Sequence, residues 1–378
     1  MGEYFDRLMG GEEICWPWLQ GVYGMTPARM ARMIRKIGMP AEIFRRAKDG
    51  ALELPGGLPE ELGAALKKAA SEEALARIAR HFERLKISVV PLNGEEYPPL
   101  LKEIASPPLA LYCRGRGKLS DLGNAISIVG SRKATEYAAR MARRFAEELA
   151  RQGITVVSGM ALGIDAAAHL GALRGGRECA LPTIAVLAGG PDSIYPACHR
   201  ELYTCILDRG LVVSESLPGT RPTSYLFPLR NRIIAGLSAG TLVAEAGEKS
   251  GTWHTVNYAL DSGRDVFALP GRAEDPACMG SNSMLKRGAK LVTSVEEILE
   301  EYPWWRQGKT QEYTGKKEAP SEEEQRLCSL LKEADRSADE LFEATQIPMG
   351  RLLSLLTKLA EKGIIERKSY MCFHYILK

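Results

Sequence analysis

The sequence lacks the features that mark several common classes of protein. Its 378 residues include eight cysteines but no CxxC pair, and the five histidines are scattered, so no zinc-site spacing is present. No apolar run reaches the roughly 18 residues of a membrane span, and the start, MGEYFDRLMGGEE, has no basic segment followed by an apolar one. We therefore expect no metal, no membrane span and no secretion, and we expect reduced thiols in a cytoplasmic protein.

A large excess of one charge is also missing. The chain carries 50 Lys and Arg residues against 47 Asp and Glu residues, which gives a net charge of +3. Bulk charge therefore neither supports nor excludes a nucleic-acid partner, and any basic site has to be built locally. The length allows two or three domains, and the 45% of hydrophobic residues can fill a sizeable core.

The region between residues 125 and 302 alternates short apolar runs with helical patterns. Short Val- and Ile-rich runs, each followed by a crossover helix, predict a parallel sheet that is covered on both faces. The predicted fold class is therefore α/β, with a doubly wound sheet. The predicted strands are Ile126–Val129, Ile154–Val157, Ile184–Leu187, Leu211–Val213, Thr241–Ala244, Asp265–Leu269 and Lys290–Val292.

Residues 1–86 predict a small helical domain. Thr26 can cap a helix that begins at Pro27, after a turn that contains Gly21 and Gly24. This pattern resembles a helix-hairpin-helix or SAM-like unit, whose hairpin often contacts a DNA backbone. The absence of a dense basic cluster favours a packing or protein-interaction role instead.

The remaining segments complete a four-part organisation. Residues 87–302 form the α/β domain, which includes an extended, proline-containing connector at its start, and residues 303–320 form a polar linker. Residues 321–378 predict three helices and a β-hairpin, the arrangement of a winged helix. The predicted elements of this last part are helices at Ser321–Lys332, Ala338–Ala344 and Met349–Lys362, and strands at Ile364–Lys368 and Cys372–Leu377.

The turn after the first predicted strand favours anion binding. Gly130 allows a close backbone approach, Ser131 supplies a hydroxyl and Arg132 supplies a guanidinium fork for a phosphate. Free backbone N–H groups point outward where a strand end opens onto a helix. An ordinary strand-to-helix turn with an exposed arginine is the open alternative.

The turn after the second predicted strand is rich in small residues. Ser158, Gly159 and Gly163 fit a phosphate-binding nest, but neither a GxGxxG fingerprint nor a Walker A loop is present, so no dinucleotide cofactor is expected. Asp165 and His169 lie four residues apart and are compatible with an acid–base pair. We favour a structural role in which Asp165 caps the helix and His169 is bonded internally, because no nucleophile or metal ligand accompanies them.

Two further segments favour anions. The sequence FPLRNR contains Phe227, Arg230, Asn231 and Arg232 and precedes an apolar helix predicted at 233–237, where arginines at the helix start oppose the dipole unless an anion compensates them. Pairing of one arginine with Glu215 or Glu245 is the alternative. The second segment, Ser250-Gly251-Thr252, opens another helix. Turns at the carboxyl ends of parallel strands share one sheet edge, and a row of such sites suits a polymer.

The ordered motifs IVGSRKAT, SGMALGIDAAAH, YPACHRELY, FPLRNRIIAGLS and VAEAGEKSGTWHT, followed by ALPG and GSNSMLKRGA, resemble the DNA-processing protein A family, DprA, also called Smf. The resemblance covers roughly residues 90–300. It implies an extended Rossmann-like domain that binds single-stranded DNA, forms homodimers, protects incoming DNA and helps to load RecA recombinase in natural transformation and recombination. It implies no enzymatic activity and no cofactor.

The resemblance also implies which residues contact DNA. Ser224 stands where the family commonly has a lysine, and Arg221 is the nearest substitute. The role of the late motif around Ser281 is expected to be structural. The implied DNA-binding residues are Gly130, Ser131, Arg132, Ser158, Gly159, Gly163, Phe227, Arg230, Asn231 and Arg232.

Two other functions stay open on the sequence. A Rossmann-like nucleotide phosphoribohydrolase would use Glu245 and Thr252, although the usual PGGxGT order of that family is absent. A winged-helix transcription regulator would use residues 321–378. The apolar recognition helix of that segment favours at most a weak duplex contact, through Arg367 and Lys368, or a protein-interaction role.

Overall fold

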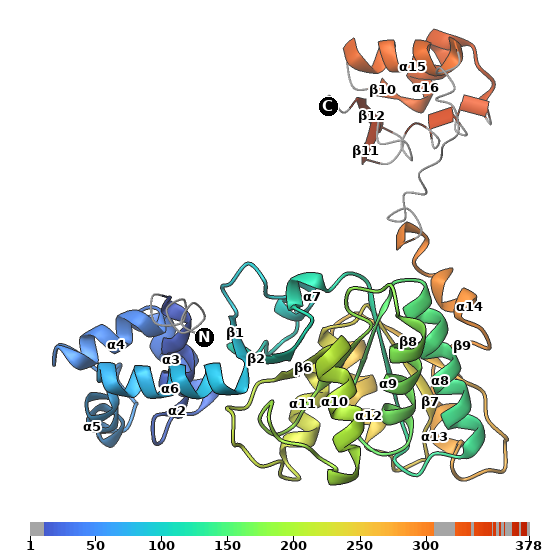
Figure 1. Ribbon diagram of the computed structural model, residues 1–378. Helices are drawn as coiled ribbons and strands as arrows, with labels where there is room; N and C mark the ends of the chain where they lie inside the picture. Colours follow the sequence, from blue (N-terminus) through green and yellow to red (C-terminus); the bar gives the residue numbers. More distant parts are fainter. Residues whose placement is uncertain are drawn as a thin grey trace. The chain divides into compact units, whose positions relative to one another are not determined.

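The chain folds into two compact units, Met1–Arg306 and Gln307–Lys378. The structure is a computed structural model, and it describes residues 11–305 of the first unit. In the second unit it describes residues 322–333, 336–349, 351, 352, 355, 356, 359, 365–369 and 372–375. Figure 1 shows the elements in chain order, coloured from blue to red.

A nine-stranded sheet forms the centre of the first unit, in the order β1-β2-β6-β5-β4-β3-β7-β8-β9. The seven strands from β6 to β9 in this order are parallel to one another, which confirms the predicted doubly wound α/β sheet. All seven predicted runs form these strands. The strands are β1 (Ile87–Pro91), β2 (Ala110–Gly115), β3 (Ala125–Gly130), β4 (Thr155–Ser158), β5 (Thr183–Val186), β6 (Leu211–Ser214), β7 (Gly240–Glu245), β8 (Asp265–Ala268) and β9 (Lys290–Leu291).

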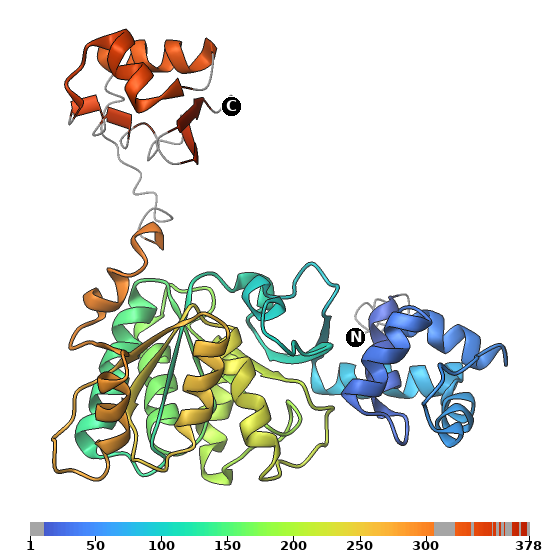
Figure 2. The ribbon, with the colours of Figure 1, turned by 180° about the vertical axis from the view of Figure 1, so that it is seen from behind.

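Helices cover both faces of this sheet, as the opposite views in Figures 1 and 2 show. Side chains alternate along each strand, so that Val156 packs toward one helical layer and Val157 toward the other. One layer contains α8 (Glu136–Arg151), α9 (Ile164–Gly175), α10 (Arg200–Arg209) and α14 (Val295–Leu299). The other contains α7 (Pro99–Lys102), α11 (Leu226–Gly236), α12 (Thr252–Asp261) and α13 (Met279–Lys286). Four short 3-10 helices complete the unit, at η1 (Glu12–Ile14), η2 (Leu119–Asp121), η3 (Ala197–His199) and η4 (Pro303–Trp305).

One of the N-terminal helices begins where the sequence predicts it, at Pro27. The side chain of Thr26 accepts a hydrogen bond from the Arg29 N–H at 3.3 Å, and Pro27 occupies the first helical position. This confirms the predicted cap, and Met30 and Met33 on the inner face of the helix are buried. The helices are α2 (Cys15–Gly21), α3 (Pro27–Lys36), α4 (Pro40–Lys48), α5 (Glu60–Ala69) and α6 (Glu72–Leu85).

The antiparallel strands β1 and β2 connect these helices to the sheet. The sequence predicts only extended segments here, but β2 pairs with β6 and adds the hairpin to the sheet edge. Ala110 and Tyr112 of β2 pack among the N-terminal helices, whereas Leu111 and Cys113 pack into the core of the sheet. The Tyr112 hydroxyl also donates to the side-chain oxygen of Gln20 at 2.6 Å.

The second unit contains helices and a three-stranded antiparallel sheet of order β10-β12-β11. The predicted helices at 321–332 and 338–344 and both predicted strands agree with the observed elements to within about two residues, the usual scatter at element ends. The third predicted helix, Met349–Lys362, and the linker at 303–320 lie partly outside the described residues, and the winged-helix assignment stays a prediction. The observed elements are α15 (Glu322–Glu333), β10 (Arg336–Ser337), α16 (Ala338–Thr345), β11 (Ile365–Ser369) and β12 (Cys372–Tyr375).

Within the described parts of both units, no helix is long and apolar enough to cross a bilayer. The same residues contain no group of three His, Cys, Asp or Glu side chains that could hold a metal ion.

Candidate functional site

An open pocket of about 850 Å³ lies at the point where the strand order of the sheet reverses. The chain runs outward from β3 through β4 and β5 to β6, and then returns to β7 on the other side of β3. In doubly wound folds the carboxyl ends of the strands at this switch point form the usual ligand site. The pocket is lined by the segments after β3, β4 and β7 and by residues of α11 and α12, so the four predicted turns do meet at one edge.

The turn after β3 is built by internal hydrogen bonds. A Cβ on Gly130 would lie 2.6 Å from the side chain of Ile164, so this glycine permits close packing. The Ser131 N–H donates to the Glu245 carbonyl oxygen at 2.8 Å, and the Ser131 hydroxyl accepts from the Lys133 N–H at 3.1 Å. These two backbone donors are therefore occupied, and the exposed cations of the turn are the side chains of Arg132 and Lys133.

Arg132 lies over an aromatic ring at the pocket. Its guanidinium carbon is 5.0 Å from the centroid of the Phe227 ring, although the two residues come from different elements. The Tyr195 ring lies on Phe227 with a centroid separation of 5.5 Å, and 49% of Tyr195 is exposed. A cation and two rings thus form one continuous surface, and Tyr195 is a pocket residue that the sequence analysis did not single out.

Arg230 lines the pocket but is held within the protein. It is only 6% exposed, and its guanidinium donates to the carbonyl oxygens of Gly159, at 2.7 Å, and Val186. Burial lowers the pKa of Arg230 to about 10, while the nearby Asp165 carboxylate opposes that shift, so the guanidinium is charged at neutral pH. Arg230 therefore ties α11 to the ends of β4 and β5 as well as adding positive charge.

Arg232 lies outside the pocket. Its guanidinium is paired with the Glu215 carboxylate and donates to the Ser106 carbonyl oxygen at 2.5 Å. The alternative in which one arginine of FPLRNR pairs with Glu215 is therefore confirmed. The expectation that the arginines stand at a helix start is wrong, because α11 already begins at Leu226. Pro228 sits in the first turn, where its missing N–H costs no hydrogen bond.

The small residues after β4 hold neighbouring residues of the site in place but do not line the pocket. The buried Ser158 hydroxyl donates to the Ile128 carbonyl oxygen at 2.7 Å, and a Cβ on Gly159 would lie 2.5 Å from the Arg230 guanidinium. Gly163 has a φ of +77° and packs on the turn after β3. None of Ser158, Gly159 and Gly163 is among the residues that line the pocket.

The internal hydrogen bond predicted for His169 is confirmed, whereas the prediction that Asp165 caps the helix is wrong: Gly163 is the N-cap residue of α9, no side chain caps it, and Asp165 bonds to the loop before the helix. An Asp165 carboxylate oxygen accepts the Ala161 N–H at 3.2 Å, and His169 Nδ1 lies 2.7 Å from the Thr183 hydroxyl. Burial raises the pKa of Asp165, although the Arg230 charge opposes this shift, and burial lowers the pKa of His169 to about 3. Neither side chain has the exposure of an acid–base catalyst, since both are buried.

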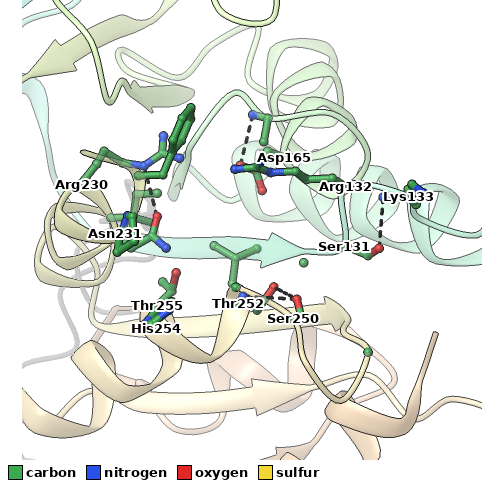
Figure 3. Close-up of a pocket in the computed structure, with 18 of the residues that line it drawn as sticks. Ser131, Arg132, Lys133, Asp165, Arg230, Asn231, Ser250, Thr252, His254 and Thr255 are labelled. Carbon is green, nitrogen blue, oxygen red and sulfur yellow. Dashed lines mark hydrogen bonds between the residues drawn. The ribbon is translucent and has the colours of Figure 1, made fainter. Parts of the chain in front are cut away.

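The segment after β7 completes the pocket (Figure 3). The Ser250 hydroxyl donates to Thr252 Oγ1 at 2.9 Å and accepts the Thr252 N–H at 3.2 Å, which fixes the start of α12. Glu245 is 1% exposed, and its carboxylate accepts hydrogen bonds from the Thr135 N–H and hydroxyl. A hydrolase that used Glu245 as a catalytic carboxylate is therefore not favoured by this geometry.

The pocket is electropositive. The charged side chains that line it are four cations, on Arg132, Lys133, Arg230 and Lys249, and one acid, Asp165. Asp165 lies against Arg230, so the net field at the open side comes from the exposed Arg132, Lys133 and Lys249. Such a groove attracts a polyanion, and its aromatic surface can stack an unpaired base.

The fold and the site define a doubly wound α/β protein with a cationic, aromatic groove at its switch point. The family described as DNA recombination-mediator protein A matches residues 88–303, and the chain belongs to this family. The family resemblance that the motifs indicated is thereby confirmed.

Relatives from several bacteria share this region. The DNA processing protein DprA of Bacillus subtilis (strain 168) is 38% identical over 230 residues, which cover 61% of this chain and 76% of that protein. Protein Smf of Escherichia coli (strain K12) is 43% identical over 214 residues, 56% of each chain, so the match spans about half of that relative's length.

Two solved structures are similar in fold. The X-ray structure of DprA from Streptococcus pneumoniae has a TM-score of 0.63 and 31% identity, and the match covers 77% of this chain and 98% of that one. A structure of DNA processing protein A from Helicobacter pylori, described as showing a unique single-stranded DNA binding mode, has a TM-score of 0.52 and 29% identity. That match covers 58% of this chain and 97% of the other.

Proposed function

We propose that this chain binds single-stranded DNA in the groove at the β3–β7 switch point, as a DNA-processing protein of natural transformation and recombination. The observation that carries the proposal is the exposed Arg132 guanidinium, 5.0 Å above the Phe227 ring at the open side of the pocket. A cation beside a stacking ring matches a strand that presents a phosphate and a base together. The description of the Helicobacter pylori relative supports the same ligand.

An unpaired strand fits the groove better than a duplex. Stacking on Phe227 and Tyr195 requires a base whose face is open, which a duplex does not offer. The cations are few and local, since the whole chain has a net charge of only +3. In this proposal the local cations of the groove, and not the net charge, attract the strand.

The wider role that we propose follows family membership. We infer that the chain protects incoming DNA, assists the loading of RecA recombinase, acts as a cytoplasmic homodimer and has no catalytic activity. In the same proposal, residues 321–378 form a winged helix that makes at most a weak duplex contact. The site residues proposed to contact the strand directly are Gly130, Ser131, Arg132, Phe227 and Asn231, with Ser158, Gly159, Gly163, Arg230 and Arg232 supporting them.

A salt series with two forms of DNA tests the ligand. Fluorescence anisotropy with a labelled single strand and the matching duplex should show tighter binding of the single strand. The logarithm of its affinity should fall linearly with the logarithm of salt, with a slope of about −0.7 per phosphate contact. Equal affinity for the duplex, or binding that does not respond to salt, would overturn the proposal.

The same samples separate the two other functions. Release of free base from a nucleoside monophosphate would support the phosphoribohydrolase in place of a binding protein. Preference for one duplex sequence over single strands would support the transcription regulator.

A further inference from the structure

One wall of the groove carries neutral hydrogen-bonding groups in place of charges. Asn231 lies four residues after Phe227 on α11, which places both on one face of the helix about 6 Å apart along its axis. Thr252 and Thr255 of α12 line the same pocket, and Figure 3 shows Thr255 beside Asn231. A base that stacks on Phe227 therefore has Asn231 within reach of its edge.

Arg230 fixes the orientation of the Asn231 amide. The Arg230 Nε–H donates to Asn231 Oδ1 at 3.2 Å. A guanidinium nitrogen only donates, so the amide oxygen must face it and the Nδ2 amino group faces the pocket. The guanidinium is itself anchored on the Gly159 and Val186 carbonyl oxygens, so this orientation is locked by buried partners.

The wall opposite Asn231 presents a donor as well. Thr252 Oγ1 accepts the proton of the Ser250 hydroxyl at 2.9 Å, so the Thr252 hydroxyl proton is not used in that bond. An amide oxygen that is turned toward Arg230 is poorly placed for the bidentate contact, one acceptor and one donor, by which asparagine recognises adenine. This part of the groove offers hydrogen-bond donors, and it fits a ligand that offers acceptors.

We propose that Asn231 reads the edge of the base stacked on Phe227 and selects a base with a keto oxygen at position 4, thymine over cytosine. The proposal rests on the proposed binding of single-stranded DNA. A thymine O4 accepts from Nδ2, whereas the cytosine N4 amino group would oppose it with a second donor. A phosphate oxygen is also an acceptor, and Arg132 over the Phe227 ring can bind one, whereas Asn231 is neutral and lies one turn along α11 from that ring. An abasic strand therefore has to separate the two contacts.

Oligonucleotides of thymine and of 5-methylcytosine test the assignment, because these bases share ring size and the methyl group and differ only in the hydrogen-bonding edge. The wild-type chain should bind oligo-thymidine at least about fivefold more tightly than the 5-methylcytosine strand. Asn231→Asp keeps an oxygen for Arg230 and turns the pocket-facing atom into an acceptor. This variant should reverse the preference, because a carboxylate accepts from N4 of cytosine.

Controls separate the base from the backbone. An abasic strand of the same length should lose the dependence on residue 231, whereas an abasic strand that still senses Asn231→Asp would assign the contact to phosphate and overturn the base-reading role. Arg132→Ala should weaken both base-containing strands by the same factor. Asn231→Leu, which adds no charge, should abolish the preference for thymine without reversing it. This variant replaces Asn231→Asp in the test if Asn231→Asp does not fold.

Two results contradict different conclusions. Equal affinity of the wild type for the two strands, or a preference that both variants at 231 preserve, would overturn base reading and leave single-strand binding in place. Failure of the wild type to bind any single strand would overturn the proposed function itself.

Discussion

Gly163 packs directly on the backbone of Ser131, so the turns after β3 and β4 are held against each other. A Cβ on Gly163 would lie 2.3 Å from the Ser131 carbonyl oxygen, and the same oxygen accepts the Ile164 N–H at 3.2 Å. Arg132 follows Ser131 in the chain. Its position over Phe227 therefore depends on a glycine of the neighbouring turn.

Gly163→Ala should destabilise the fold. The φ of +77° is unfavourable for a residue with a Cβ, at a cost of about 1–3 kcal/mol, and the contact with Ser131 adds to it. Urea unfolding of both proteins measures the difference. Gly123→Ala is the matched control, since no atom lies within 4 Å of its added Cβ, and it should change stability little. Equal losses in the two variants would show that the contact is relieved by a small movement.

Arg132→Ala should weaken single-strand binding and also reduce its dependence on salt. The variant removes one phosphate contact, so the slope of log affinity against log salt should become smaller by about 0.7. Arg140→Ala is the matched control, because Arg140 is also an exposed arginine over an aromatic ring, 5.7 Å from the centroid of Tyr137, and does not line the pocket. Equal slopes for Arg132→Ala and the wild type would remove Arg132 from the interface.

Arg230→Ala should mainly reduce the free energy of unfolding, and any loss of DNA affinity should follow from that loss of stability. The substitution leaves the buried Asp165 carboxylate without its cation and two carbonyl oxygens without their donor. Each buried carbonyl oxygen that is left without its hydrogen-bond donor costs about 1–3 kcal/mol. The free energy of unfolding should fall by that amount for each oxygen, in contrast to Arg132→Ala, which alters an exposed side chain. A variant of wild-type stability with weak binding would instead make Arg230 a direct contact.

The buried His169 should make the fold sensitive to acid. The Thr183 hydroxyl donates its proton to the Val156 carbonyl oxygen. His169 Nδ1 is therefore protonated and donates to the Thr183 hydroxyl oxygen, and the buried Nε2 of His169 has no hydrogen-bond partner. Burial lowers the pKa of His169 from 6.5 to about 3, so the unfolded chain takes up a proton that the folded chain does not. Its contribution to stability is complete above about pH 6.5 and is lost as pH falls toward about 3, by up to about 1.4 kcal/mol per unit.

Unfolding free energies measured at about pH 7.5 and about pH 5.5 test this dependence. His169→Gln keeps a donor for Thr183 without a titrating group, so its stability should fall less over the same interval. A loss in the variant as steep as in the wild type would assign the acid sensitivity to other groups.

The parallel strands were predictable because each is a short apolar run buried on both faces, with a crossover helix after it. The hairpin of β1 and β2 was predicted only as extended segments, because antiparallel pairing with β6 depends on a contact distant in sequence. The start of α11 was missed for a different reason. Pro228 was taken to precede the helix, whereas a proline is equally compatible with the first turn.

The components of the site were visible in the sequence, but their arrangement was not. The motif that contains Arg230 and Arg232 was identified as one unit, and the helix then directs Arg230 into the pocket and Arg232 toward Glu215. Side chains two positions apart on a helix point in different directions, and the partner that each one meets is set by tertiary packing. Tyr195 meets Phe227 for the same reason, and no periodic signal marks it.

The hairpin of β1 and β2 also affects how the first unit unfolds. Ala110 and Tyr112 of β2 pack in the core of the N-terminal helices, and Leu111 and Cys113 of the same strand pack in the core of the sheet. Separation of β2 from one core would therefore also expose apolar side chains of the other core. We therefore expect the two cores to share one melting transition, although the sequence pattern changes near residue 86. We also expect a substitution among the N-terminal helices to affect β6 through its pairing with β2, and the segment after β6 leads to Phe227.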